Sequence, residues 1–453
     1  MKSCDAQEIL ASLRGFTISP TTKMSEAGGN RTEGCPEYRE LTRRQFLHRA
    51  SAMTAVLAVS PSWVPKVAYA ASEDSSRDVL VSIFMRGGYD GLTLCAPFGD
   101  PGYYANRPNL AIAPPDAGTG PKLSNLDGHF GLPPAMEGLK GAFENKDLAI
   151  IHAAGLKDAT RSHFEAQRFM EAGLVSPTAG TTGWVGRHLL STAPTVENSV
   201  LRGISFTGGL PTTLTGPSGV LPVPDPANFG IYGHPETEVA RRYWLSLAYD
   251  NHPTLEASAE ASLKTLSLLR QIDFTHYVPA TSLSYPSHDF GKSMKAAAAL
   301  IKADVGVEAI QVEMSGWDTH SRQGTVEGTM AGLMQTFSQA IGTFYEDVLV
   351  ATNRKVIVVI LSEFGRKVKE NSSIGTDHGH GNVMFVMGRK IEGGRVHGGW
   401  PGLGDGQLFE GEDLEITTDY RDVLSEVVSK RLGNTNLSFV FPGYTPRFLD
   451  ILG

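Results

Sequence analysis

The chain alternates between short apolar segments and longer amphipathic ones. Five segments are almost continuously hydrophobic and rich in β-branched residues, as in strands that are buried on both faces. These segments are residues 78–85, 147–152, 307–314, 355–361 and 383–387. Longer segments repeat apolar residues every three or four positions, which is typical of helices that pack on one face. They predict helices over residues 235–249, 254–272, 288–303, 325–351 and 420–432.

The alternation of strands and helices predicts an α/β fold. We expect a three-layer sandwich in which a mainly parallel central sheet carries helices on both faces. Residues 156–233 are rich in Gly, Pro and Thr and show weak periodicity, so a loop-rich cap is expected there. Residues 71–453 are therefore expected to form a single domain.

The N-terminal 70 residues have the features of an export signal with a long n-region. The arginine pair at residues 43–44 precedes a weakly apolar stretch over residues 50–59 and a small-residue cleavage site at residues 68–70. This order is typical of a twin-arginine signal, although an amphipathic surface helix would also fit the arginines. We expect the twin-arginine export machinery to carry the folded protein across the membrane. Removal of residues 1–70 would leave a periplasmic or secreted protein.

Composition narrows the range of partners. The chain has 40 Lys and Arg residues against 48 Asp and Glu residues, a formal net charge of -8. An excess of acids argues against a nucleic-acid partner, because such proteins need basic side chains to displace phosphate counterions. No run of 18 or more apolar residues is present, so no membrane span is expected after processing. Cys95 is the only cysteine beyond the predicted signal, which excludes an internal disulfide in the processed chain.

Carboxylate and imidazole side chains follow the predicted strands. In a parallel sheet all carboxyl ends lie at one edge, where open α/β proteins bind their ligands. Such side chains are expected to converge there, and they are Asp90, Asp318, His320, Glu363, Asp377, His378 and His380. Nitrogen and oxygen ligands without thiolate suit Zn, Mn, Ca, Mg or Fe. The set would suffice for one or two divalent metal ions, which can activate a nucleophile and stabilise a leaving oxygen.

Each of these motifs also has a structural interpretation. Asp90 lies between glycines and could be a turn residue, and the Asp318-Thr-His320 spacing could form an Asx turn. Glu363 could pair with Arg366. The glycine-framed segment 375–381 is harder to explain without a site, because glycines there cost backbone entropy and favour neither helix nor strand.

Five stretches resemble the exported family called domain of unknown function 1501. They are residues 86–91, 161–166, 316–321, 362–366 and 375–382. The resemblance extends over nearly the whole chain beyond the signal. That family is placed in the alkaline phosphatase and sulfatase superfamily, so the resemblance implies an alkaline-phosphatase-like fold with one or two metal ions. It also implies transfer of a phosphoryl or sulfuryl group to a hydroxyl nucleophile, followed by hydrolysis.

The resemblance also implies roles for the candidate ligands. Asp90 resembles the first metal-binding aspartate of the superfamily, and Asp318 with His320 resembles its mid-chain ligand pair. Glu363 stands where the superfamily typically has an Asp-His pair. The residues that complete the ligand set in this interpretation are Asp377, His378 and His380.

The nucleophile is sought in the segment after the second predicted strand. The candidate catalytic residues are Ser162, Thr160, Arg161 and Arg86, the arginines as bidentate partners of an anionic group. Ser162 with Glu165 also has the spacing of a capping box, so its hydroxyl could cap a helix, attack the substrate, or do both. His163 is either a further metal ligand or a packing histidine. No sulfatase Cys-x-Pro-x-Arg signature is present, which argues against a formylglycine nucleophile.

Two functions follow from these patterns. The first is an exported metal-dependent hydrolase that acts on a small or polymeric phosphate or sulfate ester. The alternative is a non-catalytic exported protein that retains the fold and binds a polymer or partner at the cell envelope. Bound metal and turnover would distinguish them, because a protein with neither cannot be the hydrolase.

Overall fold

A central sheet of apolar strands organises the protein. The structure, a computed structural model, describes residues 77–452 except 178–179, 198, 232, 235–236 and 251–255. All of them belong to one of two compact units, Glu33–Gly453. The long strands are β1 (Val79–Arg86), β4 (Leu148–Gly155), β7 (Ala309–Ser315), β8 (Val356–Leu361) and β9 (Asn382–Gly388), and they match the five apolar segments. The export signal predicted for residues 1–70 lies outside the described residues.

Strands β8 and β1 lie at the centre of the sheet, with neighbouring strands on both sides. The order is β10-β4-β9-β8-β1-β7-β5-β6, and β11 also pairs with β4. The short strands are β5 (Gly203–Ser205), β6 (Val220–Pro222), β10 (Val396–His397) and β11 (Thr418–Asp419). Residues 156–233, expected to form a loop-rich cap, therefore contribute β5 and β6 to the sheet itself.

Only β9 departs from parallel pairing in this sheet. Its ladders with β4 and β8 are antiparallel, whereas the remaining ladders are parallel. A mainly parallel sheet is thus confirmed, with segment 383–387 as an antiparallel strand. Because β9 runs in the opposite direction, its beginning lies at the edge where the other strands end. The glycine-framed segment 375–381, which precedes β9, reaches that same edge.

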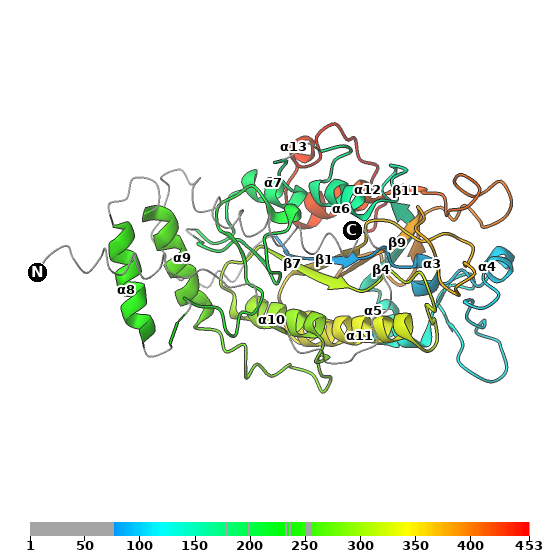
Figure 1. Ribbon diagram of the computed structural model, residues 1–453, viewed down its shortest axis with the longest axis horizontal. Coiled ribbons are helices and arrows are strands. Elements are labelled where there is room, and N and C mark those ends of the chain that lie inside the picture. The colour runs from blue at the N-terminus through cyan, green and yellow to red at the C-terminus, as the bar shows by residue number, and fades with distance from the viewer. Residues whose placement is uncertain are drawn as a thin grey trace, which may run out of the picture. The chain divides into compact units, whose positions relative to one another are not determined.

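Helices cover both faces of the sheet, which confirms the three-layer α/β sandwich (Figure 1). One face packs against α10 (Asp289–Ala303) and α11 (Thr329–Phe344). The other face packs against α6 (His163–Ala172), α7 (Trp184–Leu190), α12 (Tyr420–Glu426) and α13 (Leu437–Val440). Alternate residues of β1 enter the two cores, Ile83 on the α11 side and Phe84 on the α6 side.

The predicted helices form with small shifts at their ends. The first two are α8 (Glu238–Tyr249) and α9 (Glu256–Leu269). The helix expected over residues 325–351 begins at Thr329, because Gly328 adopts a φ of 107° that ends the preceding loop. It continues beyond Phe344 as a π-helical turn, Tyr345–Val350. Among the described residues, no helix is both long and apolar enough to span a bilayer.

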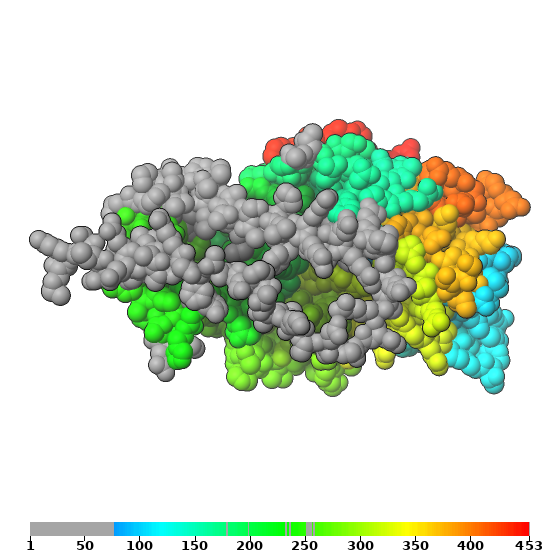
Figure 2. Space-filling view, in the orientation of Figure 1, coloured from blue at the N-terminus to red at the C-terminus, as the bar shows by residue number. Residues whose placement is uncertain are grey.

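Distant parts of the chain also meet at the carboxyl edge. Helix α4 (Pro101–Asn106) begins at Asp100, whose carboxylate accepts hydrogen bonds from the Trp400 indole and the Leu403 amide. In the space-filling view, the blue-cyan surface near residue 100 accordingly adjoins the orange surface near residue 400 (Figure 2). These contacts hold the loops that surround the carboxyl edge.

Candidate metal centre

Four loops converge where the strands of the sheet end. They follow β1, β7 and β8 and precede β9. Glycines permit the close approach of their backbones. A side chain at Gly87, which has a φ of 116°, would place its Cβ 2.7 Å from the Asp318 amide nitrogen, and one at Gly375 would lie 2.3 Å from the His320 backbone. The glycines around the predicted site thus allow these loops to pack against each other.

Three imidazoles surround one carboxylate oxygen in this position. The Nε2 atoms of His320, His378 and His163 lie 3.0, 3.2 and 3.7 Å from Oδ1 of Asp318. The Nε2 atoms of His320 and His378 are 3.1 Å apart. Ligand atoms of His163, Asp318 and His378 all lie within 4.8 Å of one another. We call these four residues the His-Asp cluster.

The separations of the imidazole nitrogens from Asp318 Oδ1 are close to those of ligands around one small cation. Zinc binds imidazole nitrogen and carboxylate oxygen at about 2.0–2.2 Å, which places tetrahedral ligands about 3.3 Å apart. The contacts of Asp318 Oδ1 with the imidazoles bracket that value. A single cation could therefore be held with little movement of these side chains.

Each imidazole is oriented through its other nitrogen. The Nδ1 atom of His163 is 2.8 Å from Glu363, that of His320 is 3.0 Å from Asp377, and that of His378 is 2.9 Å from the Arg161 carbonyl oxygen. Carboxylates and carbonyls accept a hydrogen bond from Nδ1 and leave the Nε2 lone pair directed at the centre. Metal-binding histidines are typically fixed in this way.

Burial and charge set the protonation of the cluster. Burial alone would raise the pKa of Asp318, but its contacts with the imidazoles and Arg366 hold this pKa far below its usual value. Burial lowers the pKa of His378. For His163 burial acts in the same direction, but Asp318 and Glu363 outweigh it and raise the pKa to about 9. The metal-free cluster therefore favours a proton on His163 at neutral pH.

Glu363 is enclosed among hydrogen-bond donors. Its Oε1 atom accepts from the Gly87 amide, Gln167 and His163, each at 2.8 Å. Burial would raise the pKa of Glu363, yet His163 and Gln167 lower it to about 2. Glu363, predicted as a metal ligand, is thus placed behind His163, where it orients the imidazole and stays ionised.

A buried polar chain continues from Glu363 away from the cluster. Gln167 accepts a 2.8 Å hydrogen bond from Arg86, and Arg86 in turn pairs with Glu171 and Glu313. Arg366 donates to Asp318 at 2.7 Å. Among the buried members of this group the carboxylates, Asp318, Glu363, Glu171 and Glu313, outnumber the two guanidinium groups by two when the imidazoles are neutral, and by one when His163 is protonated. A buried excess of negative charge is costly, and one divalent cation would balance it.

Asp90 lies outside the His-Asp cluster. Both of its carboxylate oxygens are bound by Arg107, at 2.5 and 2.9 Å, and both side chains are fully buried. Burial would raise the pKa of Asp90, but Arg107, Thr93 and Gln323 lower it. The structure thus gives this predicted ligand a buried arginine partner.

The two predicted anion-binding arginines also have carboxylate partners. Arg86 is bound by Glu171 and Glu313. Arg161 donates to Asp413 at 2.6 Å and to Glu410 at 2.8 Å. Carboxylates therefore neutralise the charge of both arginines.

The predicted nucleophiles lie directly before α6. Ser162 occupies the N-cap position of α6, but its side chain makes no capping hydrogen bond, so the capping box considered as one alternative does not form. Glu165 accepts instead from the Thr160 hydroxyl at 2.9 Å. Ser162 is adjacent in sequence to His163 and thereby to the cluster.

The remaining predicted ligands, Asp377 and His380, lie outside the cluster. Asp377 is half exposed and supports His320, as described above. His380 is turned away, stacked on Phe409 with ring centroids 4.1 Å apart, and burial with the Arg161 charge lowers its pKa to about 4. Of the seven predicted ligands, the structure therefore brings Asp318, His320 and His378 into the cluster.

The sequence pattern did not predict the contacts of several residues near the site. Gln167 contacts Glu363 through its side-chain amide, which no motif reveals. Arg366, considered as a partner of Glu363, donates to Asp318 instead. His163 was left open between ligand and packing, and its position four residues before Gln167 on one face of α6 is the signal that favours a site.

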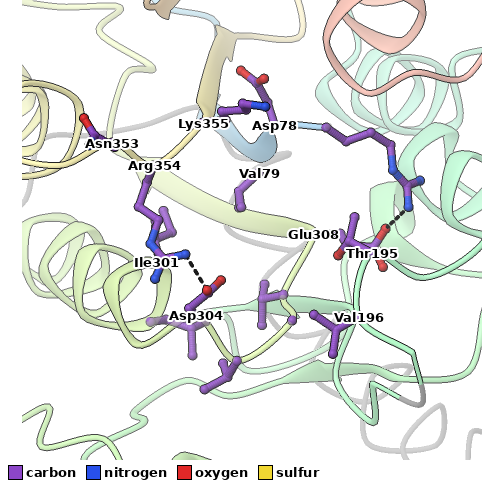
Figure 3. Close-up of a pocket in the computed structure, with 15 residues that line it drawn as sticks. Asp78, Val79, Thr195, Val196, Ile301, Asp304, Glu308, Asn353, Arg354 and Lys355 are labelled. Carbon is purple, nitrogen blue, oxygen red and sulfur yellow. Dashed lines mark ion pairs between the residues drawn. The ribbon is translucent and has the colours of Figure 1, made fainter. Parts of the chain in front are cut away.

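A hollow lies at the opposite edge of the sheet from the His-Asp cluster, where β1, β7 and β8 begin (Figure 3). Its volume is about 100 Å³. Two ion pairs line it, Arg354 with Asp304 at 2.5 Å and Arg77 with Glu308 at 3.5 Å. These charges are paired with each other, and the described residues form no cluster of metal-binding side chains in this hollow.

Comparison with known proteins gives a partial match. The family described as "Protein of unknown function (DUF1501)" matches residues 249–434, a range that includes the loops after β7 and β8 but begins after His163. No curated protein matches the chain. Among solved structures, a mutant of the TAB5 alkaline phosphatase with Mg bound in its M3 site aligns at 10% identity and a TM-score of 0.28. The alignment covers 69% of this chain and 91% of the phosphatase. A TM-score this low shows no common activity, so the established similarity is to that family over residues 249–434.

Proposed function

We propose that this protein is an exported hydrolase with a single divalent metal centre formed by His163, Asp318 and His378. The observation that carries this proposal is the convergence of imidazole Nε2 atoms on Asp318 Oδ1, each imidazole held from behind at Nδ1. The negative charge of the surrounding buried group supports a dication. The sequence predicted one or two metal ions, and we propose one.

The donor set fits Zn or another ion that accepts nitrogen ligands better than it fits Ca or Mg, which prefer oxygen. A bound ion would act as a Lewis acid and lower the pKa of a coordinated hydroxyl or water. Glu363 and the Arg161 carbonyl would keep His163 and His378 in the tautomer that leaves Nε2 available. Arg366 donates to the same Asp318 oxygen, Oδ1, so this atom would bind the ion while it accepts a hydrogen bond from the guanidinium group.

His320 is the residue best placed to accept a proton. Its side chain is 26% exposed, its Nδ1 lies on the Asp377 carboxylate, and its Nε2 faces the cluster. An imidazole backed by a carboxylate is a common general base. In this proposal Ser162 or a water molecule is the nucleophile, and the substrate is a phosphate or sulfate ester. Periplasmic or secreted location after twin-arginine export is part of the same proposal.

One observation favours the non-catalytic alternative. Arg86 and Arg161, the expected anion partners, are both bound to carboxylates, so neither charge is available to an ester anion. A protein that holds a structural metal and binds an envelope partner would show this feature without any turnover.

The test combines metal content with turnover. The purified protein would be assayed with aryl phosphate monoesters, aryl phosphate diesters and aryl sulfates, beside His320→Ala. The control is His276→Ala, because His276 forms a similar pair with Asp273 but is 81% exposed. Metal-dependent turnover that falls with His320→Ala and not with the control would support the hydrolase. Bound metal without turnover of any ester would favour the alternative.

A further inference from the structure

We propose that Gln323 is a positioning residue that sets the spacing of the two loops carrying the metal ligands. This inference rests on the proposed metal centre and assigns it a residue that no motif indicated. Gln323 lies five residues after Asp318 and its side chain is fully buried. It is not a ligand, since it acts only through the residues that it contacts.

The Gln323 amide joins three separate segments. Its Nε2 donates to Asp90 Oδ2 at 2.7 Å. Its Oε1 accepts from the hydroxyls of Thr319 at 3.1 Å and Thr376 at 2.7 Å. One side chain thus connects the end of β1 to the loop after β7 and to the loop before β9.

Both threonines are next to candidate ligands. Thr319 separates Asp318 from His320, and Thr376 comes two residues before His378. The two loops also touch directly, because the Thr376 amide donates to the Thr319 carbonyl at 3.2 Å. A shift of Gln323 Oε1 would therefore move both ligand loops together, and the Nε2 atoms with them.

The opposite end of this connection is firmly anchored. Arg107 binds both oxygens of Asp90 and also donates to the carbonyls of Lys367 at 3.0 Å and Val368 at 2.8 Å. Asp90 thus gives Gln323 a fixed acceptor. This arrangement explains why a buried carboxylate follows β1 without joining the His-Asp cluster.

The chemistry of the position requires an amide. Asp90 is an ionised acceptor, so the atom facing it must donate, whereas the threonine hydroxyls need an acceptor. Glutamine supplies both from one planar group. Glutamate would place two carboxylates together, and methionine would fill the volume without either hydrogen bond.

The test measures metal affinity and apo stability in the same variants. Gln323→Met removes both interactions, and Thr376→Val is a milder change that removes one donor. The control is Gln311→Met, because Gln311 is equally buried in β7 but its amide atoms have no hydrogen-bond partner among the described residues. Zinc affinity would be measured by competition with a chromophoric chelator, ligand geometry from the visible spectrum of bound cobalt, and stability from thermal unfolding of the metal-free protein.

We expect Gln323→Met to weaken zinc binding about 10- to 100-fold, as for other residues that orient metal ligands. The cobalt spectrum should change, and Thr376→Val should show the same effect in smaller degree. Gln311→Met should bind zinc like the unchanged protein. If either variant loses apo stability but keeps its zinc affinity and cobalt spectrum, the positioning role is refuted while the metal centre stands. Failure of the unchanged protein to bind metal would overturn both proposals.

Discussion

His163 Nδ1 and Glu363 Oε1 lie 2.8 Å apart although the two residues are 200 positions apart in the chain, and both side chains are fully buried. The contact joins the start of α6 to the end of β8 and turns His163 Nε2 toward Asp318. Glu363, which is not a member of the cluster, thus fixes the orientation of the His163 imidazole.

Removal of the Glu363 charge should weaken the metal centre without abolishing it. In Glu363→Gln the lowered negative charge would make His163 a poorer ligand, so we expect metal affinity to fall about 10- to 100-fold at unchanged stoichiometry. Chelator competition would measure it. Glu412→Gln is the control, since Glu412 pairs with Lys367 and is 56% exposed. Complete loss of metal in Glu363→Gln would instead indicate that Glu363 is a direct ligand.

Metal binding should become tighter as the pH rises toward about 9. The pKa of His163 is raised to about 9 in the metal-free protein, so below that pH a proton competes with the metal for Nε2. The dissociation constant should then fall about tenfold per pH unit between pH 7 and 9 and level off above it. The lowered pKa of His378 makes its own proton a competitor only in more acidic solution. An affinity that is flat from pH 7 to 9 would show that His163 does not bind the ion.

Asp90 should matter for stability. Asp90→Asn would leave the Arg107 guanidinium buried without its charge partner, which we expect to lower the free energy of unfolding by about 3–5 kcal/mol. Denaturant titration of the metal-free protein measures this loss. The exposed pair of Asp273 and His276 provides the control substitution, Asp273→Asn. Normal stability together with loss of one bound ion would make Asp90 a ligand of a second metal and contradict the mononuclear centre.

The charge of the substrate provides a further prediction. Arg86 and Arg161, the two predicted anion-binding arginines, are already neutralised by carboxylates. Neither of them can therefore stabilise a second negative charge on the substrate. We expect kcat/KM for a singly charged aryl phosphate diester or aryl sulfate to exceed that for the dianionic monoester by about tenfold, a difference of about 1.4 kcal/mol. A preference for the monoester by the same factor would contradict this interpretation of the arginines.

The strands of the sheet could be predicted from the sequence, whereas the hydrogen-bond and ion-pair partners of the polar side chains could not. Continuous apolar runs located every long strand, since burial on both faces leaves a clear pattern. The reversed direction of β9 was missed because hydrophobicity is the same for either direction. Even so, the segment before β9 reaches the predicted edge, because the start of an antiparallel strand lies where its neighbours end.

At the site, too, the sequence predicted which residues lie at the carboxyl edge but not which side chains pair with each other. Asp318, His320 and His378 converge where strand ends were expected to meet. Asp90 reaches the same edge, but its side chain is bound by Arg107, which lies 17 residues later in a segment without regular periodicity. Side-chain pairing of this kind depends on how the loops pack. The spacing of residues in a single sequence does not reveal that packing.

The most direct test of the central claim is to locate the ion. Crystals of the zinc-loaded protein, measured at the zinc absorption edge, would give an anomalous map together with the metal content per chain. We predict one zinc per chain, with a single peak about 2.0–2.2 Å from His163 Nε2, His378 Nε2 and Asp318 Oδ1. A protein that takes up no metal, or a peak located away from these three atoms, would contradict the proposed metal centre.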